Sequence, residues 1–262
     1  MKIIRNRRQL ERLFIYALED YFEDELRATA RAARKGTIYT PDKKALDRML
    51  TQLITQGAYI GAEEGLGPLI SMGLGFDAAL VNEAAVSFAQ EYIYTAYDVG
   101  LTNAIDAHTR EIIHREVPKW LSEGDQISEL TEALRETFGK KRAQTIATTE
   151  VTNAIAGGNI ASWREVNRQL GTNIISGSQW TTANDENVCP VCAPLGGLVF
   201  ADGETQPGSI DTQQARGITA GLGDVFVHPG GSGAADNFKG KEYYRPPAHP
   251  RCRCTLAPVV QQ

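Results

Sequence analysis

Late in the chain the sequence reads Pro246-Pro247-Ala248-His249-Pro250-Arg251-Cys252-Arg253-Cys254, and the expected architecture of the second half depends on this stretch. It offers one imidazole and two thiols. The other two cysteines stand upstream in Cys189-Pro190-Val191-Cys192, where the two-residue spacing lets one tight turn point both thiolates at the same ion. All four cysteines thus fall into two close pairs, which is not the distribution of cysteines that only fill a core.

Five side chains are candidate ligands of one tetrahedral Zn²⁺ ion: Cys189, Cys192, His249, Cys252 and Cys254. The first two form one half of the site, and the second half is His249 with Cys252, Cys252 with Cys254, or His249 with Cys254. We predict a structural zinc, because four protein ligands leave no open position for a reacting water. Such an ion would also close the long connection between the two pairs and offset its loop entropy.

Two catalytic uses of these cysteines lack part of their signatures. A glutaredoxin-type redox turn needs a βαβ setting and a helix after its first cysteine, whereas Ala193-Pro194-Leu195-Gly196-Gly197 follows here. A zinc deaminase needs H-x-E and then P-C-x-x-C. His114-Arg115-Glu116 supplies the first motif, but Val188 stands where the proline belongs.

The composition is that of a soluble globular protein: of 262 residues, 42% are hydrophobic and 23% charged. The net charge of -5 argues against a protein that wraps nucleic acid, and the basic stretches Arg5–Arg8 and Lys140–Arg142 are interpreted as solvated helix ends. No apolar run is long enough to span a membrane, and the first residues lack the pattern of a signal peptide. We therefore expect a cytoplasmic protein with reduced cysteines.

The first half is predicted to be helical almost throughout. Apolar residues recur every three or four positions from Leu10 to the Lys35-Gly36 stop. A second helix is predicted to begin with Thr40 as N-cap and Pro41 after it, and to end at the Gly65-Leu66-Gly67-Pro68 break. Phe76 to Trp120 continues as one long helix or two with a kink.

The second half changes character. Helices are predicted over Ser128–Phe138 and Ala143–Leu170, the latter weakened by Gly157-Gly158. Strands are predicted over residues 173–182, 198–200 and 255–260, which are rich in β-branched and aromatic residues. Helices first and strands last indicate an α+β protein: a mainly helical N-terminal region, residues 1–140, followed by a small α+β domain with a zinc-stapled β end, residues 141–262.

Residues 201–245 form a long glycine-rich loop within that second domain. A connection of this length without periodicity is usually functional or disordered.

Several motifs together resemble the phage head-morphogenesis family, the minor head proteins of the Mu F-like and SPP1 type. The similar stretches, covering roughly residues 143–258, are Thr148-Thr149-Glu150 with Asn153 on a helix, Trp180 on a strand, Asp185 before Cys189 and Cys192, Leu195–Phe200, and Pro246–Cys254. Two departures are that Thr148 replaces the family's usual arginine and that the 201–245 loop is longer than expected.

The resemblance implies a non-enzymatic minor capsid protein that associates with the portal vertex and assists head assembly and DNA packaging or ejection. Its implied partners are the portal protein and the major capsid or scaffolding protein, with weak or indirect contact to genomic DNA and none to a membrane. Its implied location is the virion, and the host cytoplasm during assembly.

Two alternatives stay open at this point. One is a toxin-like or nucleic-acid-modifying enzyme domain, a zinc-containing hydrolase or transferase, in which Glu150 would be the acid; its structural interpretation is a buried, hydrogen-bonded helix residue. The other is a DNA-binding module that uses Arg251 and Arg253, a weak footprint on a chain of net charge -5.

Overall fold

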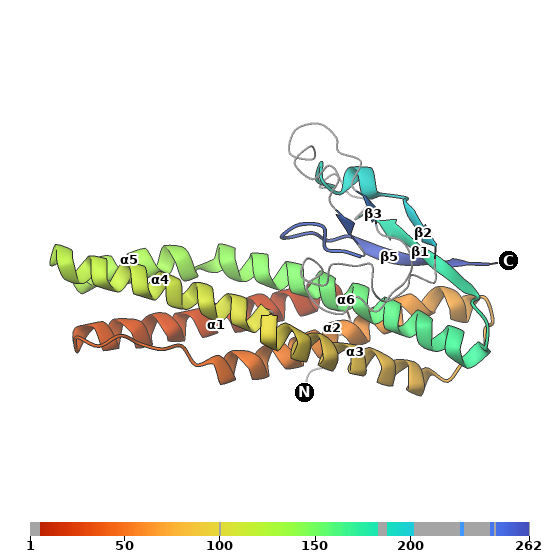
Figure 1. Cartoon of the computed structure of the whole chain (residues 1–262), viewed down its shortest axis with the longest axis horizontal. Helices are drawn as coiled ribbons and strands as arrows, with labels where there is room; N and C mark the ends of the chain where they lie inside the picture. Colours follow the sequence, from red (N-terminus) through yellow and green to blue (C-terminus); the bar gives the residue numbers. More distant parts are fainter. Residues whose placement is uncertain are drawn as a thin grey trace.

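The computed structural model describes residues 6–99, 101–182, 188–201, 226–227, 242–243 and 245–261. In these residues long helices come first and a small sheet comes last, which confirms the predicted α+β class. The helices are α1 (Arg7–Arg34), α2 (Lys43–Ser71), α3 (Ala78–Val99), α4 (Leu101–Glu123), α5 (Ile127–Phe138) and α6 (Lys140–Leu170). Figure 1 shows them as an elongated bundle with the sheet against one end of α6.

The sheet is antiparallel, with β1 (Ile175–Thr181) between β2 (Val199–Ala201) and β5 (Thr255–Val260). A short helical turn, η1 (Ala193–Leu195), lies between β1 and β2 in the chain. The strands β3 (Phe226–Val227) and β4 (Glu242–Tyr243) form a separate antiparallel pair. The three strands of the sheet agree with the predicted ones within two residues at each end.

Two hydrophobic cores meet on α6. The first half of the helix packs with α1 to α5 around residues such as Phe14, Phe22 and Ile112. The second half packs under the sheet, where Trp163 and Trp180 are completely buried. Cys192, Cys252 and Cys254 belong to this second core, so the cysteines line the apolar interior rather than the surface.

Helices α2 and α6 approach each other closely because glycines line their contact. A Cβ atom on Gly61 would lie 2.1 Å from the Ile155 carbonyl oxygen, and one on Gly158 would lie 2.1 Å from that of Ala58. This packing explains why one prediction was wrong. Gly65-Leu66-Gly67-Pro68 does not end α2, because close packing outweighs the poor helix propensity of glycine. The helix predicted over Ala143–Leu170 is confirmed, and it continues through Gly157-Gly158.

Two further predictions need correction. Asp42, not Thr40, caps α2, since its carboxylate accepts the N–H groups of Lys44 and Ala45. The interpretation of Lys140–Arg142 as a solvated helix end is wrong for Arg142, whose guanidinium lies 4.6 Å from the centre of the Phe22 ring and donates to the Ile105 carbonyl, whereas Lys140 and Lys141 are exposed. Burial lowers the pKa of Arg142 to about 10.

The expected boundary near residue 140 coincides with the start of α6, and the division into two domains stays a prediction. Most of the expected 201–245 loop, including His228, lies outside the described residues. None of the described helices is long and apolar enough to cross a membrane.

Candidate metal centre

The Cys189–Cys192 pair is held in a tight turn by its own backbone. The N–H groups of Cys192 and Ala193 both donate to the Cys189 carbonyl at 3.0 Å, and the Cys192 N–H also lies 3.4 Å from the Cys189 sulfur. The turn continues into η1, whose Leu195 is fully buried under the sheet. Packing of η1 therefore fixes the direction in which both thiols point.

The second pair comes from a turn just before β5. The Cys252 N–H donates to the His249 carbonyl at 3.1 Å, and Arg251 adopts a left-handed backbone with φ of 65°. The Arg251 N–H donates to the Thr149 hydroxyl of α6 at 2.9 Å. Cys252 and Cys254 are 1% and 4% exposed and turn toward Cys192.

The five predicted side chains converge. Cys189, Cys192 and His249 form one group of potential metal ligands, and Cys192, Cys252 and Cys254 form a second. The His249 Nε2 atom lies 2.9 Å from the Cys189 sulfur and 3.0 Å from the Cys192 sulfur, and the sulfurs of Cys192 and Cys252 are 3.7 Å apart. We call these five residues the Cys/His cluster, in which Cys192 belongs to both groups.

The donors suit a zinc ion. Two sulfurs about 2.3 Å from a tetrahedral zinc stand about 3.8 Å apart, close to the Cys192–Cys252 separation. A nitrogen and a sulfur bound to the same zinc stand about 3.6 Å apart, so His249 Nε2, which lies 2.9 and 3.0 Å from two sulfurs, would move outward by about 0.6–0.7 Å. The His249 Nδ1 atom lies 2.8 Å from the Pro250 carbonyl, which can only accept, so Nδ1 carries the proton and the Nε2 lone pair faces the sulfurs.

The thiols influence each other's ionisation. Hydrogen bonds from Cys192 and Cys254 stabilise the Cys252 thiolate and lower its pKa well below its ordinary value. The contact with Cys252, together with Cys254 and burial, raises the pKa of Cys192 well above its ordinary value. Buried thiols in contact cannot all ionise together without a cation, so a divalent metal would displace the remaining protons.

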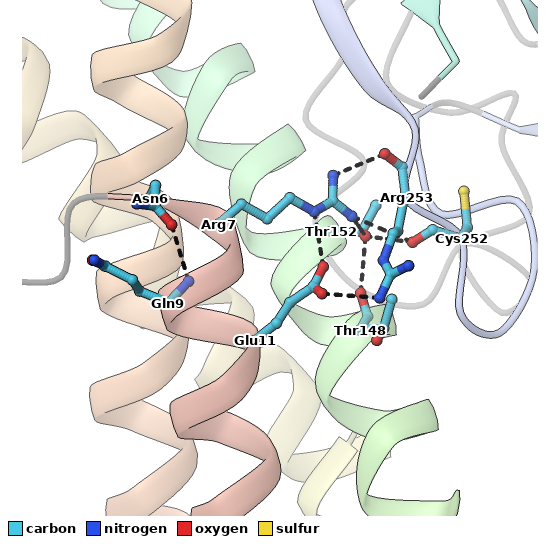
Figure 2. A network of polar contacts seen from close by, with 8 residues as sticks. All are labelled: Asn6, Arg7, Gln9, Glu11, Thr148, Thr152, Cys252 and Arg253. Atoms are coloured by element: carbon cyan, nitrogen blue, oxygen red, sulfur yellow. Dashed lines mark hydrogen bonds and ion pairs between the residues drawn. The ribbon is translucent and has the colours of Figure 1, made fainter. Parts of the chain in front are cut away.

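The start of α1 reaches this cluster. Figure 2 shows Arg7 and Glu11 of α1 beside Thr152 of α6 and the backbone of residues 252–253. Arg7 donates to the Arg253 carbonyl at 2.9 Å and also contacts the Thr152 hydroxyl. The interpretation of Arg5–Arg8 as a solvated end is therefore wrong for Arg7, whose side chain is only 19% exposed.

Arg245, a few residues before His249 in the chain, makes a second contact that attaches this segment to the helices. Its guanidinium lies 5.1 Å from the centre of the Phe88 ring and donates to the Asn153 carbonyl at 3.2 Å. A Cβ atom on Gly157 would lie 2.4 Å from the Arg245 Nη1 atom, so the glycine makes room for it. Together with Arg7, this contact holds residues 245–254, which we call the clasp segment, along α6.

Glu150 lies on α6, three residues before the Asn153 that Arg245 contacts. It is 7% exposed and accepts a hydrogen bond from the Tyr92 hydroxyl at 2.8 Å. Burial, followed by the charge of Glu150, raises the pKa of Tyr92 well above its ordinary value. These contacts match the structural interpretation of Glu150.

The catalytic alternatives gain no support from the geometry. His114 is exposed on α4 and belongs to neither group of potential ligands among the described residues. The Cys189–Cys192 turn leads into the short η1 rather than an α-helix, and both cysteines are free thiols.

Sequence reasoning identified the cluster but missed its supports, namely Arg7, Glu11, Thr152 and Arg245. The only local signal was the spacing of four between Arg7 and Glu11, which allows an ion pair on one helix face. Nothing in the sequence showed that this pair faces residue 253.

The fold and the cluster together define a class of helical protein whose small terminal sheet is fastened to the bundle through a Cys/His-rich segment. The chain belongs to the phage Mu protein F-like family, which matches residues 111–257. That match includes the whole cluster and begins in α4, earlier than the expected start near residue 143. No curated protein and no solved structure matches the chain. The family is one of phage head-morphogenesis proteins.

Proposed function

We propose that this protein is a minor head protein of a tailed bacteriophage that joins the portal vertex and assists head assembly and DNA packaging or ejection. The supporting observation is the family match, which covers more than half of the chain and includes the clasp segment. The partner would be the portal protein, with the major capsid or scaffolding protein as further partners. With a net charge of -5, contact with genomic DNA would be weak or indirect.

Exposed apolar side chains are consistent with a protein partner. Ile70, Met72 and Leu80 are 61%, 52% and 39% exposed around the turn between α2 and α3. Apolar surface of this kind is more typical of a site for another protein than for DNA.

The proposed location can be tested in particles. Heads purified from a phage that encodes this chain, carrying an epitope tag on it, should show the tag at a single vertex, in the virion and in assembling heads. The portal protein should be recovered with the tagged chain from cell extracts. Label spread over all vertices, or recovery without the portal, would contradict the proposal.

We also propose that the Cys/His cluster binds one structural Zn²⁺. Cys189, Cys192 and Cys252 would be ligands, and His249 or Cys254 would complete the tetrahedron. The contact between Cys192 and Cys252 and the orientation of His249 Nε2 support this proposal. The ion would supply no chemistry with four protein ligands, and we assign no catalytic role to Glu150.

The metal proposal predicts about one zinc per purified chain by elemental analysis. Cys192→Ser should lose the zinc and melt at a clearly lower temperature, because Cys192 lies in both groups of potential ligands. His114→Ala, which changes an exposed histidine of α4, should keep both zinc and melting temperature. Comparing the zinc affinities of His249→Ala and Cys254→Ser identifies the fourth ligand. A metal-free protein that melts like the loaded one would refute a structural role.

A further inference from the structure

A polar contact joins the first turn of α1 to the clasp segment. Arg7 lies at the start of α1, directly after the N-cap Asn6, yet its guanidinium donates to the carbonyl of Arg253 at 2.9 Å and to that of Cys252 at 3.5 Å. These two carbonyls belong to the two peptide units that link Cys252 to Cys254 through Arg253. Figure 2 shows the guanidinium directed at this backbone.

Glu11 holds this arrangement in place. Its carboxylate accepts from Arg7 at 3.0 Å through one oxygen and from Arg253 at 3.2 Å through the other. The Glu11 side chain is 8% exposed, so both bonds are shielded from solvent on the Glu11 side. The Glu11 carboxylate therefore orients both Arg7 and Arg253, the residue between Cys252 and Cys254.

Thr152 of α6 completes the network. Its hydroxyl contacts Arg7 and lies 2.5 Å from the Cys252 carbonyl. The backbone of Cys252 is thus fixed from α1 and from α6 at once. An arginine suits this task, because its planar fork presents several donors in fixed directions, whereas a lysine presents one compact charge.

We propose that Arg7, oriented by Glu11, is a positioning residue for the Cys/His cluster, so that docking of the start of α1 and metal binding are linked. The inference rests on the proposed zinc site. Arg7 acts on the backbone of the cluster, because it fixes the carbonyls of the two peptide units that link Cys252 to Cys254. The positive charge of Arg7 would also offset the net negative charge of a site in which three or four thiolates surround one Zn²⁺ ion.

Linkage requires the effect to run in both directions. Zinc should hold the clasp segment in the position that Arg7 recognises, and so protect the first turns of α1 from opening. Without zinc, the same turns should open more often, and their amide hydrogens should exchange faster.

The test compares full-length variants that differ only in α1. Arg7→Ala should weaken zinc binding by roughly tenfold to a hundredfold, the usual effect of losing a residue that orients a ligand. Arg7→Lys should bind with intermediate affinity. Arg27→Ala is the matched control. Arg27 also forms an ion pair on α1 with a glutamate four positions away, Glu23, but its side chain is 61% exposed. Zinc dissociation constants come from competition with a chelator of known affinity.

Three readouts separate positioning from simple stabilisation. The visible absorption of the Co²⁺-loaded protein should change in Arg7→Ala, because the ligand geometry changes. The melting temperature should fall more in the zinc-loaded than in the metal-free protein, whereas a merely structural role would lower both equally. Zinc should slow hydrogen exchange over residues 10–14 in the wild type but not in Arg7→Ala.

The outcomes distinguish the two proposals. If the wild type binds no zinc, the proposed metal site is wrong. If the wild type binds zinc and Arg7→Ala binds it with the same affinity and spectrum, the role of Arg7 is refuted. Should Arg7→Ala fail to fold, Glu11→Gln gives a second route, because it removes the charge that orients Arg7 and should weaken zinc binding in the same direction.

Discussion

Individual polar side chains decide how the clasp segment is placed. Cys192 connects the two groups of potential ligands, while Arg7 and Arg245 attach the same segment to the helices. The candidate ligands could be predicted, because two close cysteine pairs and a histidine leave a local pattern in the sequence. The roles of the two arginines could not be predicted. Their contacts join residues 246 and 92 positions apart, and contacts at such separations leave no local pattern in the sequence.

Glu25 illustrates a buried charge that works against stability at neutral pH. It is 3% exposed, and one of its oxygens accepts from the Tyr39 hydroxyl and the Asp42 N–H, at 3.2 and 3.3 Å. The other oxygen has no hydrogen-bond partner among the residues described. Burial is the main cause that raises its pKa above the ordinary 4.5.

This raised pKa predicts how stability depends on pH. The folded protein binds the Glu25 proton more tightly than the unfolded chain, so the favourable contribution is complete below about pH 4.5 and is lost as pH rises through the folded pKa. Relative to Glu25→Gln, the wild type should lose free energy of unfolding over that window, with a slope of at most about 1.4 kcal/mol per pH unit.

Denaturant unfolding between pH 4.5 and 8 measures this difference. The matched control is Glu23→Gln, which changes a 42%-exposed carboxylate of the same helix and should run parallel to the wild type. Parallel profiles for Glu25→Gln as well would show that the Glu25 carboxyl titrates normally in the folded protein.

At the scale of the helices, apolar periodicity predicted their order, left open whether Phe76–Trp120 is one helix or two, and gave no sign of the close contact between α2 and α6. The sequence of α2 carries Gly57, Gly61 and Gly65 at intervals of four, which places them on one face. That spacing was the available signal for a close helix contact. Only Gly65-Leu66-Gly67-Pro68 entered the prediction, as the end of the helix, because the helix propensity of glycine carries no information about the α6 backbone that packs against it.

The glycine face predicts opposite effects for two identical substitutions in α2. Gly61→Ala should destabilise the protein by about 3 kcal/mol or more, since the new methyl group would meet the Ile155 carbonyl, a backbone atom that cannot swing away. Gly67→Ala meets nothing within 4 Å and should stabilise it by about 0.5–1 kcal/mol through helix propensity. Thermal and denaturant unfolding of the two variants provides the measurement, and a neutral Gly61→Ala would mean that α2 and α6 lie farther apart.

At the scale of the whole molecule, α6 belongs to both cores and therefore couples the helical bundle to the sheet. The α+β class and the family could be predicted from the order of elements and from the motifs. The extent of contact between the two halves could not, because α6 has no single apolar stripe: its buried residues include Ala147, Val151 and Ile155 toward the bundle and Trp163 and Val166 toward the sheet. Whether residues 1–140 and 141–262 behave as separate domains stays a prediction.

The pairing of Arg7 with Arg253 also sets an order in time. The two residues are 246 positions apart, so at 5–20 residues per second the ribosome needs about 12–50 s to make the second after the first. Throughout that interval the start of α1 has emerged without the backbone that it will bind. Until then the Arg7 and Glu11 side chains lack their partner, and the cluster can be completed only after all of the described helices have been translated. The bundle is therefore expected to assemble before the Cys/His cluster does, and a zinc ion bound there would arrive among the last events of folding.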